Sequence, residues 1–340
     1  MGIEVLKNCS NSLRALRPLR LMPFSLRHEG IDGKAIFIKE TLVDTKQLRV
    51  KYHNDWPAKF PFPVEEKFAS KMQSAGLSQG LVAVPLEFTS DHQFQFYLGY
   101  LIDALDMLPM RPDLAFEHIW KAVDAEFFIV QAEIGNQKAS RFDGFVDKVL
   151  GDSNTAGAFV DYIRIIPHQT CEYAAKRVIQ ASAATDQNSG ILLNRAKQSL
   201  GEQFITSLVE KYPAGPSGKP SPGDQRKAGR LLKIVFSGTE VELRGSSFTF
   251  SQENLMKFLV KVVLANSRNE RFHGSVFPPF RSSSAKLSTY AHAYFLLHLS
   301  YSLLLEVFLY REHGVVTTNA VKSAIQHNAN LFKLLFEGVE

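Results

Sequence analysis

One stretch constrains the fold more than any other, the segment YAHAYFLLHLSYSLLLEVFLY at residues 290–310. A helix built from it is apolar on nearly every side, so other protein or lipid must surround it. It is long enough to cross a bilayer, but His292, His298 and Glu306 interrupt it, and a carboxylate in mid-membrane is costly. We therefore expect a helix buried in a protein core or a subunit interface, and no membrane span.

The composition fits a globular protein without disulfide bonds. The chain has 340 residues, which allows one large domain or two ordinary ones, and 45% hydrophobic residues, which excludes a wholly disordered chain. Its two cysteines, Cys9 and Cys171, lie far apart and in no paired motif. This cysteine usage fits a reducing compartment and argues against a cysteine-rich zinc site.

The N-terminus is basic. Residues 5–28 contain four arginines and one lysine but no acidic residue, a pattern typical of transit peptides. Pro18 and Pro23 would interrupt the amphipathic helix that such a peptide needs. We therefore expect this segment to be a basic strand or loop of a cytoplasmic protein.

The pattern of apolar residues changes near residue 90. Residues 47–53 (QLRVKYH) and 81–88 (LVAVPLEF) alternate as strands do, and residues 64–77 between them have the spacing of a helix that closes at Gly76. From about residue 93 the apolar spacing is helical. The sequence predicts a mainly α protein, with a smaller α+β domain over residues 1–90 and a helical domain over residues 91–340.

Two irregular features are expected inside the helical domain. Residues 212–229 hold four prolines and four glycines, with no large apolar residue after Tyr212, which indicates a flexible surface loop. The segments LLKIVF and TEVEL that flank Gly238 predict a small β-hairpin.

The segment VVLANSRNERFHGSVFPP, residues 262–279, carries the strongest chemical signal. An apolar helix ends there in Arg268 and His273, where a glycine and two prolines turn the chain. Another arginine–histidine pair of similar spacing occurs earlier in the sequence. Only this pair has an asparagine, Asn269, directly after the arginine and a glycine, Gly274, directly after the histidine. The combination selects Arg268 and His273 as candidate catalytic residues.

The surrounding charge allows two interpretations. Residues 255–286 contain six basic side chains and one acidic side chain, Glu270. Such an excess is typical of a surface that meets phosphate groups, and an ordinary solvated face would show it as well. Arg271 has the same two interpretations, a second phosphate contact or a solvated charge.

The motif RNERFHG resembles the Arg-polar-x-x-x-His signature of the HEPN superfamily, a group of all-α ribonucleases whose motif lies at a helix end. The segment AFEHIWKAVDAEF also resembles the first long helix of many HEPN proteins, in which an aromatic residue precedes an acidic one by four positions, here Trp120 and Asp124. The resemblance extends diffusely over residues 93–312 and leaves out residues 1–90. Ser275 replaces the tyrosine typical of HEPN toxins paired with nucleotidyltransferases, which argues against that subgroup.

The resemblance implies a HEPN-like helical bundle that acts as a metal-independent endoribonuclease in defence or toxin systems. It implies an RNA substrate, a homodimer, a controlling protein partner and no cofactor. His273 would assist the ribose 2′-OH, Arg268 would stabilise the transition state and Asn269 would organise the site, with substrate contacts from Arg271 and Asp124. The alternative is a catalytically silent HEPN-like module that binds RNA or a partner protein.

The residue types suit this chemistry. Histidine titrates near neutral pH, so His273 can exchange protons at working pH. Arginine stays charged and can hold two phosphate oxygens at once, so Arg268 suits a pentacovalent oxyanion. Asn269 can orient the imidazole or the substrate through neutral hydrogen bonds. Neither the sequence nor this chemistry calls for a metal, and we expect no metal site.

Spacing on a helix adds a condition. Side chains five positions apart point about 140° away from each other on a regular helix. Either the helix frays or bends before Gly274, or two copies of the chain converge on one cleft, as HEPN proteins generally do. The apolar helix over residues 284–312 is the predicted dimer surface, with Leu297 or Leu304 expected on its exposed side.

Overall fold

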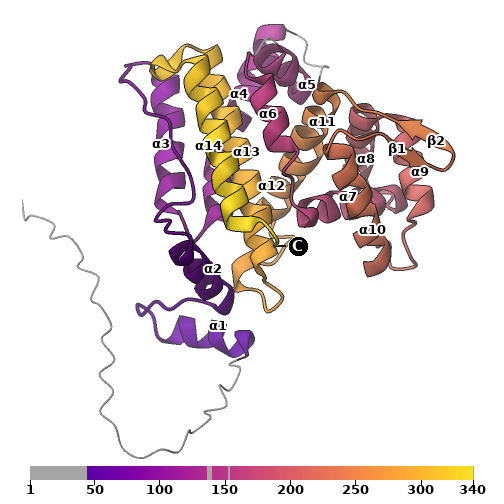
Figure 1. Cartoon of the computed structure of the whole chain (residues 1–340), viewed down its shortest axis with the longest axis horizontal. Helices are drawn as coiled ribbons and strands as arrows, with labels where there is room; N and C mark the ends of the chain where they lie inside the picture. Colours follow the sequence, from indigo (N-terminus) through magenta and orange to yellow (C-terminus); the bar gives the residue numbers. More distant parts are fainter. Residues whose placement is uncertain (1–43, 136–139, 152–153, 340) are drawn as a thin grey trace, which may run out of the picture. The chain divides into compact units, whose positions relative to one another are not determined.

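A computed structural model describes residues 44–135, 140–151 and 154–339, all of which belong to one compact unit that begins at Val43. The basic segment at residues 5–28 lies outside the described residues. The prediction of a mainly α protein is confirmed, because the described part contains many helices and a single two-stranded sheet (Figure 1).

The elements follow one another along the chain as follows: α1 (Thr45–Asn54), α2 (Pro63–Ser74), α3 (His92–Asp106), α4 (Pro112–Ile134), α5 (Arg141–Phe145), the π-helix η1 (Val146–Leu150), α6 (Ala156–Ile163), α7 (His168–Ala183), α8 (Gln187–Leu200), α9 (Glu202–Lys211), α10 (Pro222–Phe236), β1 (Val241–Leu243), β2 (Ser246–Phe248), α11 (Gln252–Phe258), the π-helix η2 (Leu259–Leu264), α12 (Ala265–Phe272), the 3₁₀ turn η3 (Pro279–Arg281), α13 (Leu287–Tyr310), the 3₁₀ turn η4 (His313–Val315) and α14 (Thr318–Phe336).

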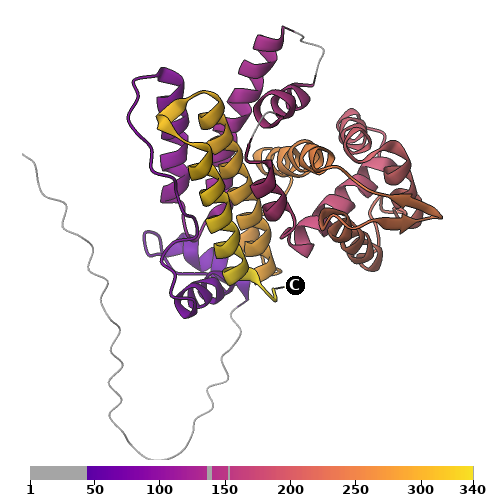
Figure 2. The same cartoon turned by 45° about the horizontal axis from the view of Figure 1, so that its top comes forward.

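The helices pack in two groups. α4 packs against both α3 and α13, while α14 packs on α13 and α6, so these long helices form one bundle (Figures 1 and 2). In the second group α7 packs against α10 and α8, and α9 contacts the antiparallel hairpin of β1 and β2. α11, η2 and α12 follow one another without a break and contact α8 and α7 of the second group.

α13 is the central helix of the bundle. In its most apolar 18-residue window, 89% of the residues are buried. It is the one helix in the described part that is long and apolar enough to cross a membrane. Leu297 and Leu304 have no exposed surface, so the prediction that they lie on an open dimer face is wrong. The apolar girth of this helix is covered inside one chain by α4, α14, α7 and α2.

Two histidines of α13 point into this interior. His298 Nε2 lies 2.7 Å from the carbonyl oxygen of Gly80, and His292 Nδ1 lies 2.9 Å from Thr170 Oγ1. Burial lowers the pKa of each to about 4; Arg271 adds to the shift for His292, and the Gly80 bond opposes it for His298.

Stability should therefore depend on pH. The unfolded chain protonates these histidines below about pH 6.5 and the folded chain only near pH 4. The free energy of unfolding should be highest above pH 6.5 and should fall as the pH drops towards 4, by at most ~1.4 kcal/mol per pH unit for each histidine. Urea unfolding at pH 7 and pH 5 measures the slope. His298→Gln, which keeps a donor for Gly80, should flatten it, whereas the exposed His327→Gln should not. An unchanged slope in His298→Gln would contradict this account.

The predicted N-terminal strands do not form. Residues 47–53 lie in α1, a helix whose first turn is capped by the Asp44 carboxylate at the Lys46 N–H. α1 has no buried residue, so the alternating apolar residues of this segment do not pack against a sheet or a core. Residues 81–88 form no ladder. The Val82 N–H donates to Asn328 Oδ1 (2.8 Å), Asn328 Nδ2 donates to the Val82 carbonyl (3.0 Å), and the Val84 N–H donates to the Tyr301 hydroxyl (2.8 Å). Side chains of α13 and α14 thus replace a neighbouring strand.

The N-terminal region also lacks the predicted boundary. Residues 44–90 belong to the same compact unit as the helices that follow, and their described elements are α1 and α2. α2 packs against α13, and Phe68 stacks on Tyr290 with ring centroids 3.9 Å apart. The described residues of this region form no strand, so the predicted α+β character is not observed. α2 contributes to the core of the helical bundle, so the region is not a separate domain.

The predicted loop and hairpin are displaced. α10 begins at Pro222, after Ser221 accepts a hydrogen bond from the Asp224 N–H (3.0 Å), so the loop ends at residue 221 rather than 229. Proline suits the first helical position because it lacks an N–H. The segment LLKIVF forms the end of α10, and the hairpin lies later, with Val241 opposite Phe248.

Candidate functional site

A continuous helix made of α11, η2 and α12 carries the predicted motif. All six residues of η2 are buried, including Lys261, whose side chain is 2% exposed. The Lys261 ammonium donates to both carboxylate oxygens of Asp143 (2.6 and 2.9 Å) and to Gln198 Oε1 (3.2 Å). π-Helical turns within α-helices are often found at functional sites. The apolar run before Arg268 gave no local sign of this turn.

The end of α12 is well defined. Gly274 adopts φ +64°, which a glycine takes at little cost. The Ser275 N–H donates to the Glu270 carbonyl (2.8 Å), and the Gly274 N–H donates to the Arg271 carbonyl (3.1 Å), which is the Schellman pattern. The His273 N–H keeps its helical bond to the Asn269 carbonyl (3.0 Å). α12 ends at Phe272, and its C-cap His273 leaves the helical conformation at φ −88° and ψ 7°, but no hydrogen bond joins the side chains of Arg268 and His273.

Three of the predicted residues lie together. Arg268 Nη1 donates to Asn269 Oδ1 (3.1 Å), and Arg268 Nη2 lies 4.0 Å from Asp124 Oδ2 on α4. Arg141 makes the closer ion pair with Asp124, at 3.2 Å. The Arg268 guanidinium also lies 4.6 Å from the centroid of the Phe272 ring. Arg268 is thus oriented by weak contacts that leave N–H donors for a ligand.

His273 is exposed just beyond the last turn of α12. Its ring meets the Phe272 ring edge-on, with centroids 5.9 Å apart, and no hydrogen bond or ion pair within the described part of the chain engages its imidazole. Arg268 and His273 both contact Phe272 but not each other. Both ring nitrogens of His273 are therefore available for proton transfer.

Arg271 has a different role from the predicted substrate contact. Its Nε donates to Glu117 Oε1 (2.6 Å) and its Nη2 donates to Asp113 Oδ2 (2.9 Å). Burial raises the pKa of Asp113, but hydrogen bonds and charge from Arg111 and Arg271 outweigh it and hold that pKa below its usual value. These ion pairs fix α12 to α4 and occupy the guanidinium, so Arg271 is neither a solvated charge nor a free phosphate contact.

A second network, which sequence reasoning missed, ties α12 to α7. The Tyr173 hydroxyl donates to Glu270 Oε2 (2.8 Å) and accepts from Asn266 Nδ2 (2.7 Å), and Arg177 forms an ion pair with Glu270. Burial raises the pKa of Tyr173, so it remains a neutral donor. Glu270 stood out only as the single acidic residue of a basic segment. α12 is anchored on two sides, which leaves Arg268 and His273 on a rigid support.

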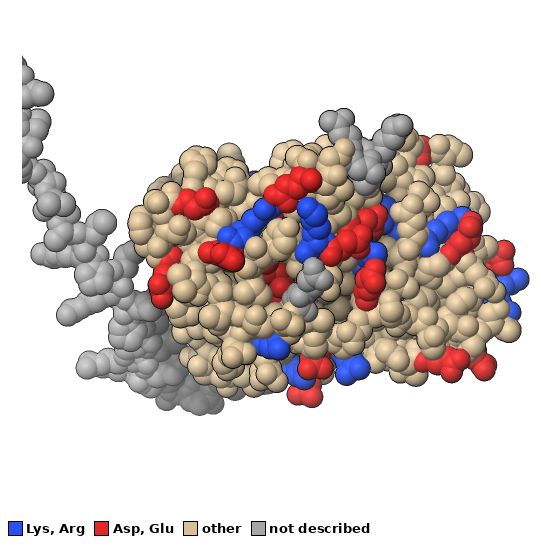
Figure 3. All heavy atoms as spheres, turned by 90° about the horizontal axis from the view of Figure 1, so that it is seen from above, with Lys and Arg blue, Asp and Glu red and all other residues tan. Residues whose placement is uncertain are grey.

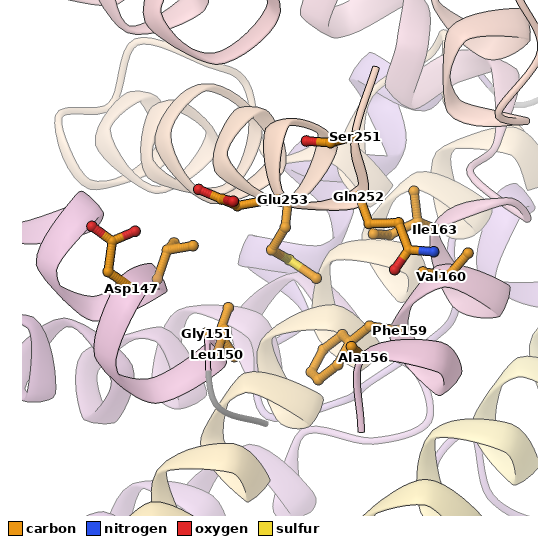
Figure 4. A pocket seen from close by; sticks show the side chains of 12 residues that line it. Asp147, Leu150, Gly151, Ala156, Phe159, Val160, Ile163, Ser251, Gln252 and Glu253 are labelled. Atoms are coloured by element: carbon orange, nitrogen blue, oxygen red, sulfur yellow. The ribbon is translucent and has the colours of Figure 1, made fainter. Parts of the chain in front are cut away.

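Two cavities help to delimit the site. One, of about 170 Å³, lies beside α12 and is lined by Glu270, Arg271 and His292 among others. The other, of about 520 Å³, lies among η1, α6 and the start of α11, with mostly apolar walls and the carboxylates of Asp147 and Glu253 (Figure 4). No lysine or arginine lines the larger cavity, so it does not suit a phosphate-bearing ligand.

The described residues contain no group of three or more His, Cys, Asp or Glu side chains that could hold a metal ion. Comparisons with protein-family models, curated proteins and solved structures gave no match. The residues around the end of α12 are therefore the candidate functional site.

Proposed function

We propose that the protein is a metal-independent endoribonuclease of HEPN type. The observation that carries the proposal is the end of α12, where a lightly held Arg268, supported by Asn269 and Asp124, precedes an unengaged His273 on a rigid helix terminus. This arrangement offers a fixed cation for a phosphate and an imidazole for proton transfer.

The proposed reaction is transfer of a phosphoryl ester within RNA. His273 removes the proton of a ribose 2′-OH, and the 2′ oxygen attacks the adjacent phosphorus while the bond to the 5′ oxygen breaks. The leaving 5′ oxygen takes a proton from an acid, in this proposal the imidazolium of a second copy. Arg268 binds the non-bridging oxygens as their charge increases. The products are a 2′,3′-cyclic phosphate and a 5′-hydroxyl.

The homodimer belongs to the same proposal. Side chains five positions apart, as Arg268 and His273 are, point about 140° away from each other on a regular helix. No hydrogen bond joins the two within one chain, which favours the predicted convergence of two copies. Because α13 is buried inside one chain, it cannot supply the dimer interface. Two exposed phenylalanines offer apolar area next to Arg268 and Asp124. Phe272, beside the motif, is 67% exposed, and Phe128, on whose ring the Arg141 guanidinium stacks, is 55% exposed.

The products test the reaction. Purified protein incubated with a labelled RNA oligonucleotide in excess EDTA should release fragments that end in a 2′,3′-cyclic phosphate and begin with a 5′-hydroxyl. Metal-activated water does not normally yield a cyclic product, so end-group analysis by mass spectrometry separates the mechanisms. Fragments with 5′-phosphates, or cleavage that requires Mg²⁺, would exclude 2′-OH attack.

The second candidate is a catalytically silent module that binds RNA. The observation in its favour is that Arg268 and His273 of one chain contact Phe272 but not each other. The same assay decides between the two candidates, since a silent module would bind the oligonucleotide and leave it intact.

A further inference from the structure

Many charged side chains in the described part of the chain are paired with opposite charges. On the face seen in Figure 3, acidic and basic atoms lie next to one another. Arg271, Arg281 and Arg311 all hold carboxylates at 2.6 Å. A surface that gathers several cations around a single carboxylate differs from these paired regions.

An open groove of about 1170 Å³ between α7, α10 and residues 284–289 is such a surface. Its one carboxylate, Glu172, lies 2.9 Å from His168. Its basic lining consists of Lys176, Arg226, Arg230, Lys233 and Lys286. In the residues that the structure describes, no ion pair engages Lys176, Arg226 or Arg230. The groove thus concentrates positive charge.

The cations follow the length of α10. Arg226, Arg230 and Lys233 occur at intervals of four and three residues, so they share one helix face over ~10 Å. Lys176 lines the groove from α7. Burial lowers the pKa of Lys176, and the neighbouring charges of Arg177 and Lys219 lower it further. A bound polyanion would reduce the electrostatic repulsion between these neighbouring cations.

The groove has a rigid base. Gly229 of α10 lies against α7, where an added Cβ would come within 2.9 Å of Glu172 Cα. The absent side chain lets the two helix backbones approach closely. α7 also carries Tyr173, which holds Glu270 and so positions α12. The cationic lining and the catalytic motif are therefore attached to the same helix.

The groove also adjoins the motif. Gln169, Tyr173 and Thr289 line both the groove and the smaller cavity beside α12. The groove exceeds the ~300–1,000 Å³ usual for small ligands, which favours a polymer. Neutral donors and acceptors such as Gln225 and Ser288 and the 44%-exposed Ile234 supply contacts for sugars and bases.

We propose that the groove between α7 and α10 binds the phosphate backbone of single-stranded RNA and guides it towards the end of α12. The inference rests on the proposed ribonuclease function, because it identifies where that substrate binds. Contacts made through arginine and lysine to phosphates predict binding with little sequence preference and a strong salt dependence.

Binding can be measured without cleavage. Full-length His273→Ala and a fluorescein-labelled poly(U) oligonucleotide would be titrated by fluorescence anisotropy at several salt concentrations. Adding Arg226→Gln and Arg230→Gln should weaken binding at least ~10-fold and lower the slope of log affinity against log salt by about 1.4, at ~0.7 for each lost phosphate contact. The matched control is Lys322→Gln with Lys333→Gln, two exposed cations of α14, which should change neither quantity.

The outcomes separate the two proposals. If the wild-type protein cleaves RNA but the groove variant binds with unchanged affinity and slope, the groove assignment is overturned and the ribonuclease stands. If binding depends on the groove but the wild-type protein never cleaves, the groove stands and the enzyme assignment fails. Binding of anionic lipid vesicles in place of RNA, lost in the same variant, would also overturn the inference.

Discussion

His273→Ala is expected to lower RNA cleavage at least ~10²-fold while changing the free energy of unfolding by less than ~0.5 kcal/mol. Proton transfer by a positioned side chain contributes about 10²–10⁴-fold to a rate. The stability should be nearly unchanged because the imidazole is exposed and has no polar partner within the described chain. Cleavage of a labelled oligonucleotide and urea unfolding of the same preparation measure the two quantities.

Two further variants make this result specific. His327→Ala removes another exposed histidine, whose Nδ1 lies 3.3 Å from Ser323 Oγ on its own helix, and this variant should cleave at the wild-type rate. Arg268→Lys keeps the charge but loses the two-point binding of phosphate, so it should be as inactive as His273→Ala. A folded His273→Ala protein that cleaves within twofold of the wild-type rate would remove this residue from the mechanism.

Mixing wild-type and His273→Ala chains tests whether two copies of the chain form one catalytic cleft. If each site needs the histidines of both copies, co-folding wild-type protein with a tenfold excess of His273→Ala should reduce cleavage per wild-type chain to about a tenth, because few wild-type chains find a wild-type partner. If each chain acts alone, the excess should have no effect. Cleavage per wild-type chain that stays constant across the mixing series would show that the site belongs to one copy.

The parts of the fold that the sequence predicted depend on local pattern. The buried α13 follows from an apolar surface on all sides, and the end of α12 follows from Gly274, which can adopt a positive φ. The strand predicted at residues 81–88 failed for a long-range reason. Its backbone forms no ladder, and its hydrogen-bond partners include Tyr301 and Asn328, more than 200 residues away. Alternation alone cannot distinguish a strand from a loop whose backbone is bound by side chains.

In the candidate site, too, some features follow from local sequence pattern and others depend on residues far away in the sequence. Asp124, singled out through the family resemblance, lies on α4 at 4.0 Å from Arg268 of α12, which was singled out by its neighbours in the sequence. The carboxylates that occupy Arg271 belong to α4 and lie more than 150 residues earlier. A local excess of basic residues therefore overstated the charge available to a ligand. The cationic face of α10 was not predicted because Arg226 fell within the predicted loop and Lys233 within the predicted hairpin, so no helical face could be assigned.

The largest effect on stability is expected at Glu126, which lies on α4 and is 0% exposed. The Tyr97 hydroxyl donates to its Oε2 (2.5 Å), and Arg311 Nε donates to its Oε1 (2.8 Å). Burial raises the pKa of Tyr97, and the Glu126 carboxylate raises it further, so the phenol stays a neutral donor. The carboxylate thus joins α3, α4 and the end of α13 at one buried point.

Glu126→Ala should lower the free energy of unfolding by about 3–5 kcal/mol, because it leaves the buried Tyr97 phenol without its acceptor and Arg311 with Glu133 as its remaining carboxylate partner. Glu133→Ala is a closely matched control. Glu133 lies on the same helix and accepts from the same Arg311 (2.6 Å), but its side chain is 34% exposed, so its loss should cost less than about 1 kcal/mol. Urea unfolding of both variants at one pH gives the comparison. Equal losses would mean that burial does not set the strength of these ion pairs.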